Sequence, residues 1–211
     1  MELEIVMQGM RDFERAKGVK IGEGSERSCF LNAFDSNRCF KVSRQENSLQ
    51  TRREIKFFED LSKKNIKLSF LPIYYGAFKI KNFIGYEQES FVDHTRGGNY
   101  DSVVSLGEYI EDSKNDLEKI LHDLNQIKFE MLSKNILCCD LSTSNIIVAI
   151  SKNNARYVII DGFGATEFIP ICKYFKFFGR KKIERQWKKL EQRLIPWIYK
   201  RKRDNSEIKF L

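Results

Sequence analysis

Long hydrophobic runs are missing from this sequence of 211 residues. No stretch approaches the roughly 18 consecutive apolar residues that a membrane-spanning helix needs, so we expect no transmembrane segment. The first residues, Met-Glu-Leu-Glu-Ile, lack the basic region and the apolar core of a secretion signal. We therefore expect a cytoplasmic protein, with peripheral attachment to a membrane left open.

Histidine is scarce, and the cysteines lack the spacing of a metal site. His94 and His122 are too few to suggest a metal cluster. The five cysteines include the adjacent pair Cys138 and Cys139 but no C-x-x-C, which indicates free thiols in a reducing compartment. A composition of 42% hydrophobic and 31% charged residues is that of a soluble globular protein. The length suffices for a small lobe and a larger one.

The net charge of +8 is concentrated near the C-terminal end. Residues 173–203 hold thirteen Lys and Arg against Glu184 and Glu191, a net +11, which leaves −3 for the rest of the chain. The segment 168–178 is also dense in aromatic residues. Pro196 interrupts a helical apolar pattern that consists of Ile183, Trp187, Leu190 and Leu194.

Two interpretations of this basic region stay open. In the first, residues 180–203 bind an anionic partner (acidic lipid, lipopolysaccharide-like phosphate or an acidic protein), with Trp187 and Trp197 as apolar anchors. In the second, the apolar stripe closes the core of the C-terminal lobe, Trp187 is buried, and the charges form a solvated face. We do not expect nucleic acid as the partner.

Near the middle of the chain, three polar residues stand at fixed places between apolar runs. Asp140 follows a short apolar run, and Asn145 comes five positions later. Two β-branched runs around a polar turn, residues 145–150 and 157–160, predict a β-hairpin. Asn145 would stand at its entrance and Asp161 at its exit, on the same side as Asp140.

The order and spacing of these three residues suit phosphoryl transfer. One carboxylate orients or deprotonates the attacking hydroxyl, while an Asn and a second carboxylate hold Mg²⁺ against the phosphates of ATP. The spacing is typical of the protein-kinase catalytic loop and magnesium motif. Asp140 is thus the candidate base, and Asn145 and Asp161 are the candidate metal ligands. The alternative is that Asp140 and Asn145 cap a turn and Asp161 ends a strand.

The first part of the chain predicts the remainder of such a site. Gly22 and Gly24 lie in a loop ahead of a predicted hairpin, whose second strand carries Lys41 among apolar neighbours. In kinases a lysine at this position binds the α- and β-phosphates and pairs with a helix glutamate. Residues 45–62 predict an amphipathic helix with Glu54 on its inward side. A buried carboxylate is costly unless it is paired, so we expect a Lys41–Glu54 ion pair rather than an exposed Glu54.

The remaining segments predict further strands, a linker and a second helix. Arg27 stands where the usual glycine-rich loop has a third glycine. Residues 70–78 and 83–92 predict two more strands, and the backbone near residues 89–92 is the candidate segment for binding adenine. A glycine-bearing break at residues 95–99 predicts a linker. A long amphipathic helix is predicted beneath the catalytic hairpin by Leu117, Leu121, Leu124, Ile127 and Met131.

With these residues, the chain resembles the YrbL-type PhoP regulatory network proteins, a bacterial family similar to small protein-kinase-like folds. The likeness covers most of the length and is carried by Arg38-Cys-Phe-Lys-Val, the Arg53-Glu54 helix start, Ile73-Tyr-Tyr-Gly, Asn145-Ile-Ile-Val and Lys182-Ile-Glu-Arg-Gln-Trp-Lys-Lys. The last segment is the most family-specific. The resemblance implies a cytoplasmic protein tied to envelope or Mg²⁺-stress regulation in Gram-negative bacteria.

The general kinase pattern is met only in part. Cys138 and Cys139 replace the His-Arg before the Asp, and Ser142 stands where protein kinases usually carry lysine. The magnesium motif reads Asp-Gly-Phe-Gly, and the Ala-Pro-Glu segment and the helical subdomain beyond it are missing. These losses remove much of a platform for a peptide substrate.

We expect an α+β, two-lobed, protein-kinase-like fold with an abbreviated C-terminal lobe. Residues 1–94 would form a β-rich lobe with one helix, and residues 95–211 a mainly helical lobe with the catalytic hairpin and the basic tail. The expected function is ATP- and Mg²⁺-dependent phosphotransfer to a hydroxyl acceptor. The alternatives are a pseudokinase that binds nucleotide as a regulator, and a non-enzymatic adaptor that acts through the basic tail.

Overall fold

The computed structural model describes residues 19–152, 154–164, 172 and 175–207. The chain divides into two compact units. The first comprises Met1–Val103 with the hairpin tip Ile150–Asn154, and the second Val104–Ala149 with Ala155–Leu211. The residues predicted as a linker, 95–99, belong to the first unit. Two of the aromatic residues noted in the sequence, Phe168 and Tyr174, lie outside the described residues.

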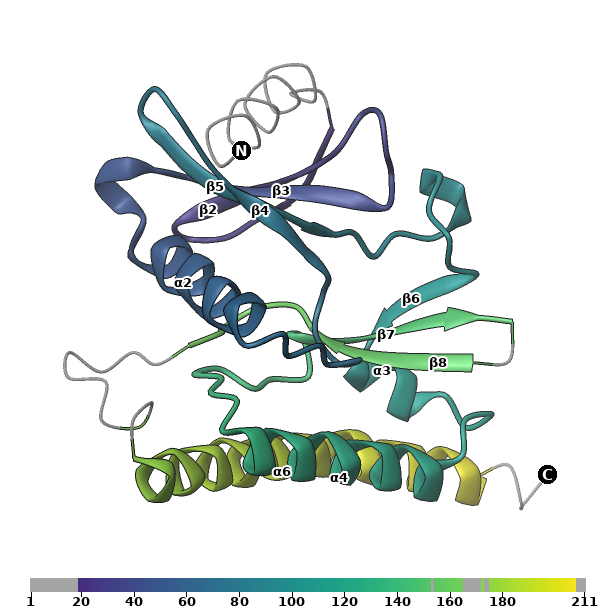
Figure 1. Ribbon diagram of the computed structural model, residues 1–211. Helices are drawn as coiled ribbons and strands as arrows, with labels where there is room; N and C mark the ends of the chain where they lie inside the picture. The colour runs from purple at the N-terminus through teal and green to yellow at the C-terminus, as the bar shows by residue number, and fades with distance from the viewer. Residues whose placement is uncertain (1–18, 153, 165–171, 173–174, 208–211) are drawn as a thin grey trace. The chain divides into compact units, whose positions relative to one another are not determined.

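The first unit is an antiparallel sheet with a helix (Figure 1). The strand order is β1-β2-β3-β5-β4. Its elements are β1 (Lys20–Glu23), β2 (Arg27–Leu31), β3 (Arg38–Arg44), the 3-10 turn η1 (Gln45–Asn47), α2 (Leu49–Lys63), β4 (Tyr74–Ile80), β5 (Phe83–Glu89) and η2 (His94–Arg96). The predicted hairpins and the predicted helix over residues 45–62 are therefore confirmed.

Strand alternation explains the two faces of this sheet. Phe40 and Val42 of β3 are buried in one apolar cluster with Phe78 and Ile80 of β4. Since successive side chains of a strand point to opposite faces, the residue between Phe40 and Val42 points the other way. That residue is Lys41, so the strand itself sets the direction of this side chain.

The second unit combines a three-stranded sheet with helices (Figure 1). The strand order is β6-β7-β8, and the boundary between the units falls within β6. The elements are β6 (Ser102–Ser105), α3 (Leu106–Glu111), α4 (Leu117–Lys134), β7 (Ile146–Ser151), β8 (Asn154–Ile159) and α6 (Lys176–Glu207). The mixed helix and strand content confirms the predicted α+β class.

Local signals explain where α3 and α4 begin and where α4 ends. The Ser105 hydroxyl accepts from the backbone N–H of Glu108, and the Glu108 carboxylate accepts from the Ser105 N–H, which is a capping box. Asp116 caps α4 by accepting from two backbone N–H groups. Asn135 ends α4 in a left-handed conformation with φ of 53°. The sequence interpretation missed both β6 and α3, which are short.

Helix α6 overturns one expectation and distinguishes the two interpretations that were open for Trp187. It runs for 32 residues and continues through Pro196, which was expected to interrupt it. Packing on both sides of the proline offsets the missing N–H, because Leu194 and Arg201 are both buried. Trp187 is only 2% exposed and serves as core, so it is no anchor for a partner. Trp197 packs on α3, where a Cβ on Gly107 would lie 2.6 Å from its ring.

Helix α6 is held to both α3 and α4. Arg201 donates to the carbonyl oxygen of Ile110, and Nζ of Lys128 lies 2.8 Å from Oε1 of Glu191. Its long amphipathic run thus closes the core of the second unit. Among the described residues, no helix is both long enough and apolar enough to cross a bilayer.

Candidate active site

Glu54 is fully buried in the first unit, where the side chains of Arg27 and Tyr86 both contact it. Nη1 of Arg27 lies 2.6 Å from Oε2 of Glu54, and the hydroxyl of Tyr86 donates to the same oxygen at 2.5 Å. Nη2 of Arg27 lies 3.3 Å from Oε1. The inward position of Glu54 is thus as predicted. The involvement of Arg27 was missed, because Arg27 stands at an expected glycine of the loop.

Lys41 lies on the sheet face that α2 covers. It is 7% exposed and stands directly opposite Tyr86 in the β3–β5 register. Ser43, two residues along the same strand, shares that face, and its hydroxyl lies 2.6 Å from that of Thr51 on α2. Lys41 and Glu54 therefore belong to the same side of the small sheet. The direct ion pair between them stays a prediction.

The end of β5 carries buried polar atoms next to the predicted adenine segment. Oε1 of Gln88 and Oγ of Ser90 are buried and have no hydrogen-bond partner among the described residues. Such atoms are costly unless something binds them. Gln88 stands opposite Cys39, whose pKa is raised well above its usual value by the hydrogen bond with the Cys29 thiol and by burial. Cys39 is thus a neutral thiol beside Gln88.

The glycine loop is a short bend between β1 and β2. The N–H of Gly24 donates to the carbonyl oxygen of Arg27 at 2.8 Å. A Cβ at Gly22 or at Gly24 would meet its nearest neighbour at 3.6 or 3.7 Å, an ordinary contact. The fold of the described residues therefore does not demand glycine at these two positions. Their predicted role at phosphate stays a prediction.

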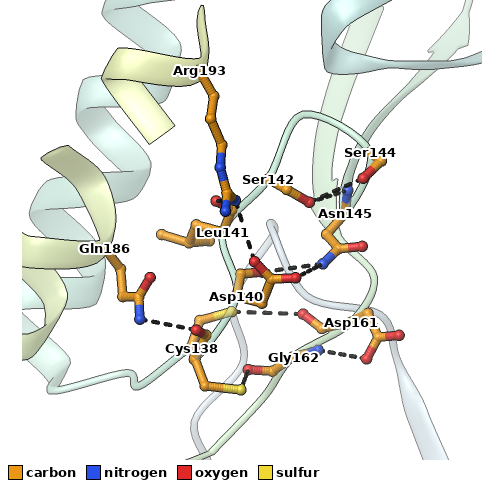
Figure 2. A network of polar contacts seen from close by, with 11 residues as sticks. Cys138, Asp140, Leu141, Ser142, Ser144, Asn145, Asp161, Gly162, Gln186 and Arg193 are labelled. Carbon is orange, nitrogen blue, oxygen red and sulfur yellow. Dashed lines mark hydrogen bonds and ion pairs between the residues drawn. The ribbon is translucent and has the colours of Figure 1, made fainter. Parts of the chain in front are cut away.

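Asp140 and Asn145 are joined directly in the second unit (Figure 2). Nδ2 of Asn145 donates to Oδ2 of Asp140 at 3.0 Å and to its carbonyl oxygen at 3.2 Å. The loop between them is shaped by Ser142, whose hydroxyl accepts from the Asn145 N–H at 3.2 Å. The spacing of five residues thus brings both polar side chains to the start of β7.

Asp161 comes to the same place from the end of β8. The Ile160 N–H donates to the Asn145 carbonyl oxygen at 2.9 Å, which ties the exit of the hairpin to its entrance. Asp161 accepts from the N–H of Gly162 at 2.6 Å. A Cβ on Gly162 would lie 3.2 Å from the backbone N and O of Asp140. The three predicted residues are therefore neighbours.

The paired cysteines hold the two segments together. The N–H of Cys139 donates to the Gly162 carbonyl oxygen at 2.7 Å, and Cys138 forms an isolated antiparallel bridge with Phe163. The Cys138 thiol also lies 3.6 Å from the Asp161 carbonyl oxygen. The backbone of Cys138 and Cys139, with the Cys138 thiol, thus ties the segment before Asp140 to the segment around Asp161.

Helix α6 supplies two residues that the sequence interpretation missed (Figure 2). Nη1 of Arg193 lies 3.2 Å from Oδ1 of Asp140 and donates to the Leu141 carbonyl oxygen at 2.8 Å. Gln186 donates to the Cys139 carbonyl oxygen at 2.9 Å. The Asp140 carboxylate is therefore held on one side by Asn145 and on the other by Arg193.

Comparison with known proteins decides the family. The family described as PhoP regulatory network protein YrbL matches residues 16–195. The chain belongs to this family. Its matched region includes Asp140, Asn145, Asp161 and the helical segment that carries Gln186 and Arg193.

Relatives of this YrbL-family chain are found in enteric bacteria. The YrbL proteins of Escherichia coli (strain K12) and Shigella flexneri are each 25% identical over 175 residues, covering 80% of this chain and 81% of theirs. Among solved structures, the PknI kinase domain of Mycobacterium tuberculosis matches with a TM-score of 0.43 at 9% identity. That match covers 68% of this chain and 56% of the kinase-domain chain.

Asn145 and Asp161 are the residues of this YrbL-family chain that could hold Mg²⁺ together with a phosphate ligand. Among the described residues, no group of three or more His, Cys, Asp or Glu side chains could hold a metal. Mg²⁺, however, is usually held by one or two carboxylates together with substrate phosphates. Asp161 and Asn145 fit such a donor set. The unpartnered Gln88 and Ser90 atoms suit a polar ligand at the end of β5.

Proposed function

We propose that this chain is a kinase-like phosphotransferase that uses ATP and Mg²⁺ to phosphorylate a hydroxyl acceptor. The observation that carries the proposal is the convergence of three residues in the second unit. Asn145 bonds Asp140 at 3.0 Å, and Gly162, next to Asp161, packs on the Asp140 backbone. A base with two metal-binding side chains beside it is what phosphoryl transfer requires.

Each residue then has a role. Asp140 orients the acceptor hydroxyl and takes its proton as the hydroxyl oxygen bonds to the γ-phosphorus and the ADP oxygen leaves. Asn145 and Asp161 would hold Mg²⁺, which neutralises the charge of the phosphates. Lys41, oriented by Glu54, would bind the α- and β-phosphates with the backbone at Gly22 and Gly24.

A second candidate is a pseudokinase that binds nucleotide as a regulator. The observation that favours it is the state of Asp140. Both carboxylate oxygens are engaged, one by Asn145 and one by the guanidinium of Arg193. A carboxylate whose two oxygens already accept from other side chains is less available to an acceptor hydroxyl.

The family description supports a link between the proposed activity and a bacterial regulatory network. We infer a role in envelope or Mg²⁺-stress signalling in the cytoplasm, because this description names a PhoP regulatory network. We further infer an anionic partner for residues 180–203. Acidic lipid, lipopolysaccharide phosphate and acidic protein share the chemistry that this basic region would bind.

A thermal-shift titration of the full chain tests the proposal. ATP with Mg²⁺ is compared with ATP in chelator and with Mg²⁺ alone. A ligand that binds only the folded state stabilises it and so raises the unfolding temperature. The stabilisation grows with the logarithm of the ratio of ligand concentration to Kd. We expect Mg²⁺-dependent stabilisation by ATP. Stabilisation without any turnover would leave the pseudokinase, and no stabilisation would leave the adaptor that acts through its basic tail.

A further inference from the structure

Helix α6 exposes an aromatic cluster at its beginning. Phe175, Phe177 and Phe178 are 61%, 62% and 49% exposed. The ring centroids of Phe177 and Phe178 are 5.6 Å apart, and those of Phe175 and Phe178 6.4 Å. Single exposed apolar residues are common, but adjoining ones mark a contact surface.

The first turn of α6 is fixed so that these rings face outward. Gly179 is buried against the end of α4, and a Cβ there would lie 1.9 Å from Oδ1 of Asn135. Asn135 in turn donates to the Cys172 carbonyl oxygen at 3.0 Å. Phe177 and Phe178 lie about 200° and 100° around the helix from Gly179, so neither shares its inward side.

Cations continue the exposed face beyond the aromatic cluster. Nζ of Lys181 lies 4.4 Å from the ring centroid of Phe177. Phe178, Lys181, Arg185 and Lys188 follow one another at intervals of three or four residues, which places them on one stripe. All four are exposed, whereas the opposite side of the helix, with Trp187, is buried.

We propose that this face, defined by Phe177, Phe178, Lys181, Arg185 and Lys188, docks on a lipid bilayer that contains acidic phospholipid. The proposal deepens the anionic-partner part of the proposed function. The cations alone would suffice to bind an acidic protein or a free polyanion. Adjoining exposed rings beside a basic stripe are instead the features of a helix that lies in the membrane interface.

The geometry fits peripheral attachment. The inner side of α6 is occupied by its own unit, so the helix would lie along the surface and contact lipid only through its outer face. The rings would enter the headgroup and acyl boundary while the cations remain at the acidic headgroups. Asp140, Asn145 and Asp161 are not among the residues of this face.

Co-sedimentation of the full chain with vesicles tests the proposal. We expect binding to vesicles of phosphatidylglycerol with phosphatidylethanolamine, little binding to phosphatidylcholine alone, and weakening as salt screens the charges. Phe177→Ser with Phe178→Ser should lower vesicle binding about tenfold or more. Lys181→Glu with Arg185→Glu should lower it by about as much.

Matched controls carry the same changes elsewhere. Phe129→Ser removes a ring on α4 that is 68% exposed, and Lys119→Glu reverses an exposed charge on the same helix. Neither control should alter vesicle binding. Because every changed side chain is exposed, circular dichroism should show the same fold for all variants.

Heparin, a soluble polyanion, separates the two levels of the proposal. If the chain binds heparin but not vesicles, the bilayer proposal is overturned and an anionic partner still stands. If the Phe177/Phe178 variant binds vesicles as well as wild type, docking through this face is overturned. If neither heparin nor acidic vesicles are bound at low salt, both fail.

Discussion

Nη1 of Arg27 lies 2.6 Å from Oε2 of Glu54, and the two side chains are 7% and 0% exposed. The pair joins β2 to α2 on the face of the small sheet that α2 covers. Lys41 was the partner expected for Glu54, and it shares the same sheet face. Arg27 therefore supports the carboxylate that the proposed site needs, from a position where a more usual loop has glycine.

Loss of this guanidinium should destabilise the first unit. We expect Arg27→Met to lower the free energy of unfolding by about 3–5 kcal/mol, because it leaves Glu54 buried with less compensation. The exposed Arg44, 3.9 Å from Glu46, is a matched control, and Arg44→Met should change stability by less than about 1 kcal/mol. Urea unfolding measures both.

A double variant distinguishes a lost charge partner from lost packing. Arg27→Met combined with Glu54→Leu should recover part of the stability lost by Arg27→Met alone, since an apolar pair can replace a buried ion pair. A double variant as unstable as the sum of the two single changes would contradict the ion pair as the reason.

A substitution at Gly162 tests how closely the segment with Asp140 must approach the segment with Asp161. Its φ is +81°, and a Cβ would lie 3.2 Å from the backbone N and O of Asp140. Gly162→Ala should lose about 1–2 kcal/mol through backbone strain and should also lower turnover by moving Asp140. Gly97, with φ of +77° and its nearest neighbour at 3.6 Å, is the control for strain alone.

Measurements of stability and of turnover then separate backbone strain from displacement of Asp140. Gly97→Ala should lose similar stability and keep its turnover. Equal turnover in the two variants would show that the contact between Gly162 and Asp140 does not matter for the site.

Arg193 tests whether helix α6 positions the proposed base. The Asp140 and Arg193 side chains are 56% and 48% exposed, so Arg193→Ala should cost less than about 1 kcal/mol of stability. If Arg193 orients Asp140, the variant should lose roughly tenfold in kcat with unchanged nucleotide Kd, and Arg193→Lys should recover part of it. Lys189→Ala, on an exposed part of the same helix, is the control.

The opposite result has a definite meaning. A rise in turnover for Arg193→Ala would show that the guanidinium restrains the base rather than orients it. That outcome would contradict the positioning role.

The sequence predicted the parts of the site that depend on local spacing. Asp140, Asn145 and Asp161 were found because a loop and a β-hairpin bring residues close in sequence to one place. Glu54 was found because helical periodicity puts it on the inward face with Ile55 and Phe58. These relations need no knowledge of distant packing.

The partners from distant segments could not be predicted in the same way. Arg193 is 53 residues from Asp140 in the chain, and an exposed arginine in a basic helix resembles any solvated cation. Arg27 and Gln186 are polar residues whose contacts depend on how separate elements pack. Pro196 was misjudged because helix α6 is stabilised by tertiary packing, which overrides the local preference.

The central claim is an ATP- and Mg²⁺-dependent site built on Asp140 and Asp161. Nucleotide affinity with Mg²⁺ and the rate of phosphotransfer or ATP hydrolysis are measured for wild type, Asp161→Asn, Asp140→Asn and a surface control, Asp112→Asn. Asp161→Asn should weaken Mg²⁺-dependent nucleotide binding, because an amide lacks the charge that a divalent ion requires. Asp140→Asn should bind nucleotide nearly as wild type and lose roughly 10²–10⁴-fold in turnover. Wild type that shows no affinity for nucleotide, with Asp161→Asn indistinguishable from it, would contradict the account.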